Sequence, residues 1–286
     1  MMHKTFYVAQ SIYSAPGSCS ETLTRVDADP KVVAQWVSSF MQHPRGPESK
    51  ERGFASEQVD DLELRSVADI LSLAMKRGLF SGKPSNNKIG GVCRDFAILA
   101  VSRFREAGIP ARLRVGFADY LVPGHWEDHW LCEWWDGGQW KRLDVEFAAL
   151  DVVDFDPLNV PCERFLTASD AWFLIKDQPE ISLRFGVSSL DLRGEWFLAG
   201  SLLREIAALR RLELKPWDYW GISQNLSRLS SEWSRESRET LNQLASRLKN
   251  AELEGVGAPT DLADLPLPKC VTSFPKGEAV FVKLRD

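Results

Sequence analysis

The stretch Gly90–Ala100, GGVCRDFAILA, places a cysteine at the point where a helix is expected to begin. Apolar residues recur at helical spacing from Val92 to Phe104, and Gly108 is typical of a position just past a helix end. In the first turn of a helix, a thiol lies among unpaired backbone N–H groups and at the positive end of the helix dipole, both of which lower its pKa. Although most buried free cysteines are inert packing residues, this position makes Cys93 a candidate nucleophile.

A β-hairpin is predicted around Asp136–Gln139, because two glycines separate two aromatic-rich runs there. Pairing across this turn joins residues of opposite charge and residues of aromatic character: Glu133 with Arg142, and Trp135 with Trp140. In the same register, His129 and Asp144 share one face of the sheet as diagonal neighbours. Their side chains are then close enough for the imidazole to donate a hydrogen bond to the carboxylate. The pattern indicates a histidine held by an acid.

Cys93, His129 and Asp144 together predict nucleophilic catalysis by a thiol. A histidine that an acid orients acts as a general base when its other ring nitrogen faces a nucleophile. Cys93 would attack an amide or ester carbonyl, His129 would carry the proton, and Asp144 would hold the imidazole ring. The resulting thioester intermediate would pass its acyl group to water or to an amine. Hydrolysis and transfer use the same three residues.

Three motifs occur here in an order that is typical of one family of cysteine enzymes. They are Gly91–Ala97, like G-x-C-x-x-x-A; Ala107–Arg112, AGIPAR; and Asp128–Glu133, like a strand with H-x-W-x-E. Over roughly Leu62–Leu150, the sequence resembles the transglutaminase-like superfamily. That resemblance implies Cys93 as the nucleophile, His129 as the base and Asp144 as the orienting acid, on a papain-like core.

The fold class expected from this resemblance and from the helix and strand patterns is α+β. A helix bearing the nucleophile is expected to pack on an antiparallel sheet in a papain/transglutaminase-like core, followed by a helical C-terminal extension. We divide the chain into a catalytic core at residues 1–156, with an N-terminal strand at Phe6–Ala9 and helices, and a mainly helical region at residues 157–286. A strand at Ala279–Lys283 is the candidate to return to the core sheet.

The other elements are inferred from capping signals and periodicity. Asp29 and Pro30 are typical of the N-cap and first residue of a helix. We expect a helix from Pro30 to about His43, a loop at Gln42–Gly53, a helix over Leu64–Gly78, a loop at Ser81–Gly91, a strand over Leu113–Phe117, and helices over Ser169–Lys176, Arg193–Leu212 and Leu226–Leu248. Apolar residues alternate with polar ones in the 113–117 strand, which predicts that only one of its faces is buried.

The composition excludes several classes of protein. The 286 residues carry a net charge of −5 and no compact block of Lys and Arg, which argues against nucleic acid as a partner. No apolar run is long enough to span a bilayer, and the apolar stretch near the N-terminus is too short for a secretory signal, so no membrane partner and a cytoplasmic location are expected. The five cysteines contain no CxxC pair, which argues against a disulfide framework and a zinc knuckle. No cofactor and no metal are expected.

Three further residues are candidates around the nucleophile. The backbone N–H of Cys93 is the natural first donor of an oxyanion hole, and the side-chain candidates are Asn86, Asn87 and Trp126, of which Asn87 is preferred. Trp126 is expected in a loop, where it is a candidate wall of a substrate groove. The expected substrate is a protein, a peptide or a small amide.

Three alternatives stay open. His125, His129 and Cys132 could be metal ligands, although His129 and Cys132 point to opposite faces of an extended strand. The chain could also be a non-catalytic binding or scaffold module with the same fold. Among enzymes, a peptidase or amidase is preferred over an acyltransferase, because water is always available and the calcium-site pattern D-x-D-x-D-G is missing.

Overall fold

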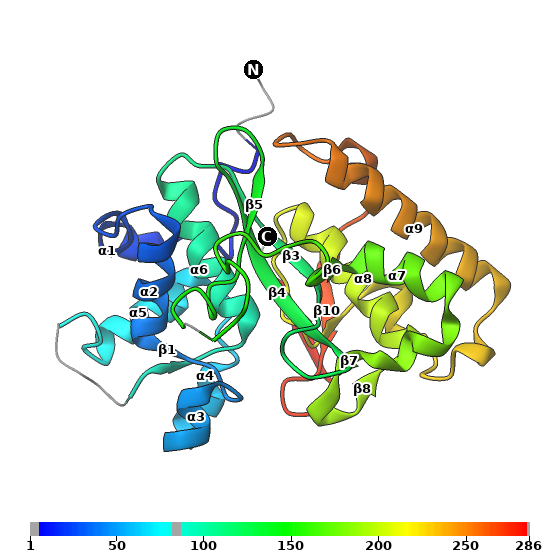
Figure 1. Ribbon diagram of the computed structural model, residues 1–286, viewed down its shortest axis with the longest axis horizontal. Helices are drawn as coiled ribbons and strands as arrows, with labels where there is room; N and C mark the ends of the chain where they lie inside the picture. The colour runs from blue at the N-terminus through cyan, green and yellow to red at the C-terminus, as the bar shows by residue number, and fades with distance from the viewer. Residues whose placement is uncertain (1–5, 82–86, 151, 285–286) are drawn as a thin grey trace. The chain divides into compact units, whose positions relative to one another are not determined.

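The computed structural model describes residues 6–81, 87–150 and 152–284 (Figure 1). Contacts divide the chain into two compact units, which are Met1–Leu113 with Leu131–Val160, and Arg114–Trp130 with Pro161–Asp286. The boundary between the units falls within two strands, β3 (Ala111–Ala118) and β4 (Trp126–Trp135). The sequence-based division after residue 156 stays a prediction.

The expected α+β class is confirmed. A six-stranded sheet has the order β6-β3-β4-β7-β8, with β5 paired to β4 off this path. The bounds of its short strands are Trp140–Leu143 for β5, Phe165–Thr167 for β6, Phe185–Val187 for β7 and Leu192–Arg193 for β8. β4 pairs antiparallel with β5 and parallel with β7, so the sheet is mixed.

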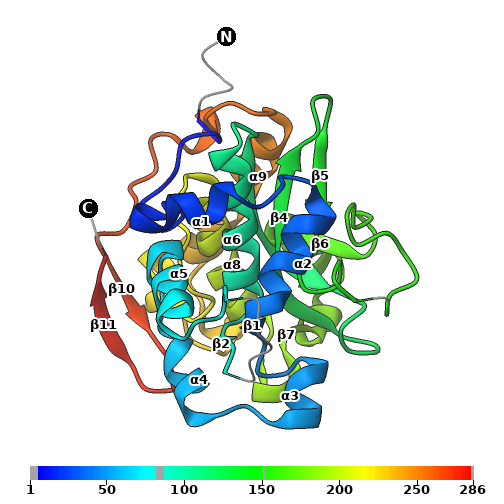
Figure 2. The same ribbon diagram turned by 90° about the vertical axis from the view of Figure 1, so that its left-hand side faces the viewer.

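The first unit is built around helix α6 (Cys93–Glu106), which is buried along almost its whole length. Three helices pack against or beside it (Figure 2): α1 (Ser20–Thr24), α2 (Pro30–Phe40) and α5 (Val67–Lys76). The remaining elements are α3 (Pro47–Arg52), α4 (Ser56–Asp61) and a parallel pair of two-residue strands, β1 (Met41–Gln42) and β2 (Ile89–Gly90). The Asp29 carboxylate accepts the N–H groups of Lys31 and Val32, at 3.0 and 3.1 Å, which confirms the predicted N-cap of α2.

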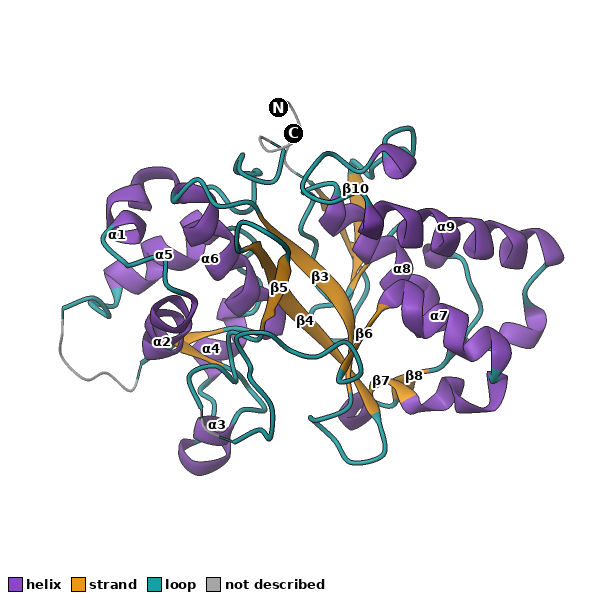
Figure 3. Cartoon of the chain, turned by 45° about the horizontal axis from the view of Figure 1, so that its top comes forward, coloured by secondary structure: helices purple, strands orange, loops and turns teal. Residues whose placement is uncertain are grey.

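The second unit contains three long helices and a small sheet of its own (Figure 3). The helices α7 (Ala168–Asp177), α8 (Glu195–Leu209) and α9 (Arg235–Leu253) pack on one another. The antiparallel sheet joins β9 (Asp218–Tyr219), β10 (Cys270–Ser273) and β11 (Val280–Lys283). Short 3₁₀ turns occur in the first unit at Gly17–Cys19, and in the second unit at Pro179–Arg184, Ser188–Leu190, Gly221–Gln224, Ser230–Glu232 and Thr260–Leu262.

Several expected elements differ from the structure. Phe6–Ala9 forms turns instead of a strand, although the carbonyl of Tyr7 accepts the N–H of Ala111 at 3.0 Å. The expected loop at 42–53 contains helix α3, which begins at a proline in the first helical position. The helix expected from residue 64 begins at Val67, because Ser66 caps it by accepting the N–H of Asp69.

The C-terminal region is less helical than expected. β11 pairs with β10 in a separate sheet and does not return to the six-stranded one, which is a correction to the predicted strand at Ala279–Lys283. The same region instead supplies β6, β7 and β8 to the six-stranded sheet. The expected helix over Leu226–Leu248 begins only at Arg235, where the Ser234 hydroxyl accepts the N–H of Ser237.

Strand β3 is buried on both faces, whereas alternation predicted one exposed face. The Arg112 side chain pairs with Glu133 at 2.8 Å, and the Arg114 side chain pairs with Glu205 at 2.6 Å. Each arginine is at most 2% exposed. Two charged side chains can be buried at polar positions of a strand when carboxylates compensate them, which explains the difference from the prediction.

The predicted register of the hairpin is confirmed. Glu133 pairs with Arg142 and Trp135 with Trp140. The carboxylate of Asp136 accepts the N–H groups of Gly138 and Gln139, both at 2.9 Å, and so closes the turn. Because side chains alternate along a strand, this register places His129, Leu131 and Glu133 on one face of β4.

We expect Gly90→Ala to destabilise the first unit. A Cβ at Gly90 would lie 2.1 Å from the backbone carbonyl oxygen of Gln58, which is too close for either group to stay in place. Overpacking of this kind costs about 1–3 kcal/mol in the free energy of unfolding, which urea denaturation measures. Gly138→Ala is the matched control, because its Cβ would meet nothing closer than 3.7 Å. Equal stability of the two variants would contradict the close approach at Gly90.

Candidate active site

Cys93 is the first residue of α6, and its neighbours fix the start of the helix. The Val92 N–H donates to the Asp95 carboxylate at 3.1 Å, and the Asp95 N–H donates to the Val92 carbonyl at 2.7 Å. Asp95 also pairs with the buried Arg94 at 3.0 Å. Cys93 is 6% exposed, so its thiol lies in a largely enclosed position at a helix N-terminus. The expectation that a helix begins at this cysteine is confirmed.

The segment leading into Cys93 is held at each of its two glycines. The Gly90 N–H donates to the Asp61 carboxylate at 2.9 Å, and the Gly91 N–H donates to the Gln42 carbonyl at 3.0 Å. Strand β2 pairs with β1 over the same residues. A rigid approach of this kind limits the positions that the Cys93 backbone can adopt, which favours a preorganised site.

His129 lies in the middle of β4 and is 3% exposed. The ring of Tyr120 meets its imidazole edge-on, with the ring centroids 6.0 Å apart. The next residue on the strand, Trp130, is 2% exposed. Strand pairing and burial on both sides therefore restrict the orientation of the His129 ring.

Asp144 directly follows β5 and is 1% exposed. Its N–H donates to the Pro157 carbonyl at 2.9 Å, and its carboxylate oxygen Oδ1 accepts the N–H groups of Glu146 and Phe147, at 3.1 and 3.2 Å. The Asp144 carbonyl also accepts the N–H of Ala148 at 2.9 Å. Asp144 therefore shapes the turn that follows it, in addition to any part it takes with His129.

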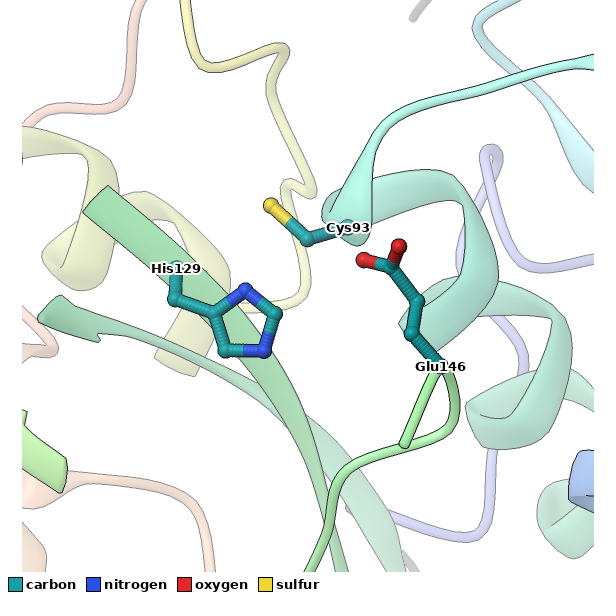
Figure 4. Close-up of side chains that lie close together, drawn as sticks. All are labelled: Cys93, His129 and Glu146. Atoms are coloured by element: carbon teal, nitrogen blue, oxygen red, sulfur yellow. The ribbon is translucent and has the colours of Figure 1, made fainter. Parts of the chain in front are cut away.

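Within the first unit, Glu146 brings a carboxylate close to the Cys93 thiol. One of its carboxylate oxygens lies within 4.8 Å of the Cys93 Sγ, whereas His129 belongs to the second unit. Figure 4 shows the three side chains, which come from the start of α6, from β4 and from the segment after β5. No sequence pattern pointed to Glu146. Its position depends on the turn at Asp144, two residues earlier, which gives no periodic or motif signal.

The neighbouring Cys93 and Glu146 could contribute ligands to a metal ion. Sulfur and carboxylate oxygen are both donors that Zn²⁺ accepts. The alternative ligand set from the sequence, which added His125 and Cys132 to His129, is not among the groups found within the described residues. The ring nitrogen Nε2 of His125 instead lies 3.3 Å from the Gly186 carbonyl. Cys132 is on the opposite face of β4 from His129.

Burial raises the pKa of the Cys132 thiol well above its ordinary value, while the nearby Arg105 guanidinium opposes this shift to a lesser extent. Cys132 is 0% exposed. Since the thiolate is the reactive form of cysteine, this side chain is protonated and inert near neutral pH. Its role as a packing residue agrees with the expectation from the sequence.

The weaker site candidates lie in different surroundings from those expected. Trp126 is the first residue of β4 instead of a loop residue, and its ring stacks on that of Phe185 at 5.8 Å. Asn87 is exposed and directly precedes the segment that enters β2. Asn86 lies outside the described residues. Trp126 is partly exposed.

Residues 74–145 match the family profile of the transglutaminase-like superfamily. The match confirms the resemblance seen in the motifs, and it includes Cys93, His129 and Asp144. Similarity to this superfamily supports a thiol-dependent enzyme in general terms.

Comparisons with solved structures and with curated proteins show weak similarity or none. A solved structure of a candidate cysteine protease from Cytophaga hutchinsonii is 19% identical to this chain, with a TM-score of 0.36. The similarity covers 56% of this chain and 44% of that one, so this chain spans less than half of the length of that protein. A TM-score this low supports no argument about function. No curated protein matches the sequence.

In the part of the chain that the structure describes, none of the helices combines the length and the apolar character needed to cross a bilayer.

Proposed function

We propose that this protein is a thiol-dependent acyl-transfer enzyme that cleaves an amide bond, with Cys93 as the nucleophile, His129 as the general base and Asp144 as the acid that orients the imidazole. The observation that carries the proposal is the position of Cys93 as the first residue of α6, where its thiol lies at the N-terminus of a buried helix. The match to the transglutaminase-like superfamily supports it. The expected substrate is a protein, a peptide or a small amide.

The proposed reaction has two steps. In the first, His129 takes the thiol proton, the Cys93 sulfur attacks the carbonyl carbon, and the C–N bond breaks as His129 returns the proton to the leaving nitrogen. In the second, His129 takes a proton from water, the hydroxide oxygen attacks the thioester carbon, and the C–S bond breaks as the His129 imidazolium returns the proton to the Cys93 sulfur, which releases a carboxylic acid and regenerates the thiol. An amine in place of water would yield a new amide. Hydrolysis is preferred, as water is always present.

The tetrahedral intermediates need hydrogen-bond donors near the carbonyl oxygen. The backbone N–H of Cys93 is the first proposed donor, because it lies at the start of α6, at the positive end of the helix dipole. Asn87 is proposed as a weak side-chain donor and Trp126 as a wall for the substrate. Asn87→Ala is the informative variant, because an oxyanion donor affects kcat whereas a purely structural residue affects stability.

An acyl donor incubated with a fluorescent amine would separate the two reactions. A panel of peptide amides serves as the donor, and mass spectrometry follows the products. Free acid alone supports hydrolysis, whereas a product that carries the amine supports transfer. No turnover of any donor, with a Cys93 that does not react with electrophiles, would favour the non-catalytic binding module.

Thiol labelling in the native protein is expected to be selective. At pH 7.5, iodoacetamide should modify Cys93 first, the exposed Cys162 at the rate of an ordinary thiol, and the buried Cys132 not at all. Because the pKa of Cys132 is raised, the fraction of its thiolate is small at this pH. Peptide mapping of the modified sites measures the order. Equal labelling of all five cysteines before unfolding would contradict the proposed reactivity of Cys93.

A divalent metal site is the second candidate function, and the neighbouring sulfur and carboxylate oxygen of Cys93 and Glu146 favour it. If the protein is a metalloenzyme, a chelator should abolish its activity and added Zn²⁺ should restore it. If Cys93 acts as a nucleophile, the activity should persist in the presence of the chelator, and added Zn²⁺ should inhibit the enzyme by binding to the thiolate. These opposite responses distinguish the two candidates.

A further inference from the structure

The carboxylate of Glu146 lies beside the proposed nucleophile, yet the triad chemistry assigns it no role. One of its oxygens is within 4.8 Å of the Cys93 Sγ (Figure 4), and both residues belong to the first unit. Glu146 is partly exposed, whereas Cys93 is 6% exposed. A molecule that reaches the thiol would therefore pass close to a carboxylate that solvent can reach.

The backbone around Glu146 is fixed independently of its side chain. Its N–H donates to Asp144 Oδ1 at 3.1 Å, and the N–H of Phe147 donates to the same oxygen at 3.2 Å. The Asp144 carbonyl accepts the N–H of Ala148 at 2.9 Å. The turn consequently presents the side chain of residue 146 at a defined place, while none of these three hydrogen bonds uses the Glu146 carboxylate.

The charge of this carboxylate affects which molecules can approach the thiol. A negative charge so close repels substrates that are negatively charged near the reacting carbonyl. A cationic group on the substrate that lies beside Glu146 can instead pair with the carboxylate through charge-assisted hydrogen bonds. An ammonium group would thus hold the substrate next to the nucleophile.

We propose that Glu146 is a specificity-determining residue, which selects substrates that carry an ammonium group next to the carbonyl attacked by Cys93. The inference rests on the proposed function of Cys93 and adds the class of substrate: basic peptides or amides. The ammonium can come from a lysine side chain or from a free amino terminus, and the two sources share the same recognition by a carboxylate.

Charged thiosulfonate probes test this inference without a substrate. Each probe transfers its sulfenyl group to the Cys93 sulfur, so a disulfide forms and methanesulfinate leaves. We compare a probe with a trimethylammonium group and one with a sulfonate group, and we measure the rate at Cys93 by peptide mapping. In the wild type the cationic probe should react faster, and Glu146→Gln should reduce the ratio of the two rates by about five-fold or more. Glu146→Asp, which keeps the charge, should retain most of the ratio.

Glu21→Gln is the matched control. Ser20 donates to Glu106 at 3.1 Å, so α1 lies by the C-terminal end of α6, whereas Cys93 is at the N-terminal end. The 14 residues of α6 separate the two ends by about 20 Å, well beyond the Debye length of about 8 Å at physiological salt. The Glu21 variant loses the same charge and should leave the rate ratio unchanged.

The outcomes separate the inference from the function on which it rests. A reactive Cys93 whose rate ratio is the same in the wild type and in Glu146→Gln would overturn the inference alone. A Cys93 that reacts with neither probe, even with small neutral reagents, would overturn the proposed function and the inference together.

Matched substrates then identify the source of the ammonium. Three peptide amides differ only in the residue next to the cleaved bond, which is lysine, acetyl-lysine or glutamate, and a further pair differs in whether the amino terminus is free or acetylated. The wild type should prefer one ammonium-bearing member by about five-fold or more in kcat/KM, and Glu146→Gln should lose that preference. If no ammonium group improves kcat/KM in the wild type, the proposal is wrong.

Discussion

Replacing Cys93 by alanine should abolish amide cleavage, with a fall in kcat of about 10⁴-fold or more. The thioester cannot form without the sulfur. A water molecule activated by His129 is a poor replacement for a nucleophile that the helix holds in place. Turnover of a panel of fluorogenic peptide amides measures the effect. Cys93→Ser retains a nucleophilic atom of lower reactivity and should fall between the wild type and Cys93→Ala.

Two controls keep this result interpretable. Cys162→Ala removes an exposed thiol outside the proposed site and should leave the activity unchanged. The Cys93→Ala protein should still fold, because the hydrogen bonds at Gly90 and Gly91 and the cap formed by Asp95 do not use the thiol. Full activity in Cys93→Ala would disprove a thiol mechanism, and the metal-dependent reaction would then be the candidate to pursue.

Glu205→Gln should destabilise the second unit by about 3–5 kcal/mol, the typical cost of breaking a buried ion pair. The Glu205 carboxylate is 0% exposed and accepts two hydrogen bonds, from Arg114 at 2.6 Å and from the Val115 N–H at 3.0 Å. A neutral amide leaves the buried guanidinium of Arg114 with less compensation, although Glu252 still pairs with it at 2.7 Å. Urea denaturation followed by tryptophan fluorescence measures the change.

Glu239→Gln provides the comparison for an exposed pair. Arg235 and Glu239 are four residues apart on α9, and their side chains are 92% and 56% exposed. Pairs of this kind contribute little, because water and salt screen them. The midpoint of unfolding should therefore stay at the wild-type value. If Glu205→Gln behaves in the same way, the buried network around β3 does not stabilise the fold as we infer.

The sequence was most informative where local chemistry alone determines the structure. The start of α6 follows from helical periodicity, and the register of the hairpin follows from its two glycines and from the Glu133–Arg142 pair. The Asp29 cap of α2 is likewise a local signal. Each of these features depends on neighbours in the chain or on a partner across a short turn, so a single sequence contains the necessary information.

The features that the sequence did not reveal depend on distant partners. Arg112 and Arg114 look like exposed positions of a strand until Glu133 and Glu205 are seen beside them. The strand at Val280–Lys283 has a correct local pattern, but its partner, β10, cannot be inferred from that pattern. The requirement for a glycine at position 90 also depends on a residue distant in the sequence, because the backbone of Gln58 leaves no room for a Cβ.

The residues of the candidate site also differ in whether the sequence alone reveals them. Cys93, His129 and Asp144 lie in recognisable motifs, and their catalytic roles stay predictions. Glu146 carries no motif, and only the folded turn places its carboxylate near the sulfur. Trp126 was expected in a loop and lies in β4, because its pairing with Phe185 involves a segment about sixty residues further along the chain.

The turn held by Asp144 has a consequence for how preferences can change in related enzymes. Since the N–H groups of Glu146 and Phe147 donate to Asp144 Oδ1, this turn is held by main-chain donors and does not depend on which side chain stands at position 146. A lysine at position 146 would favour acidic substrates, and a leucine would favour apolar substrates. A substitution at this one position could therefore change the substrate preference of such an enzyme, either in evolution or by protein engineering.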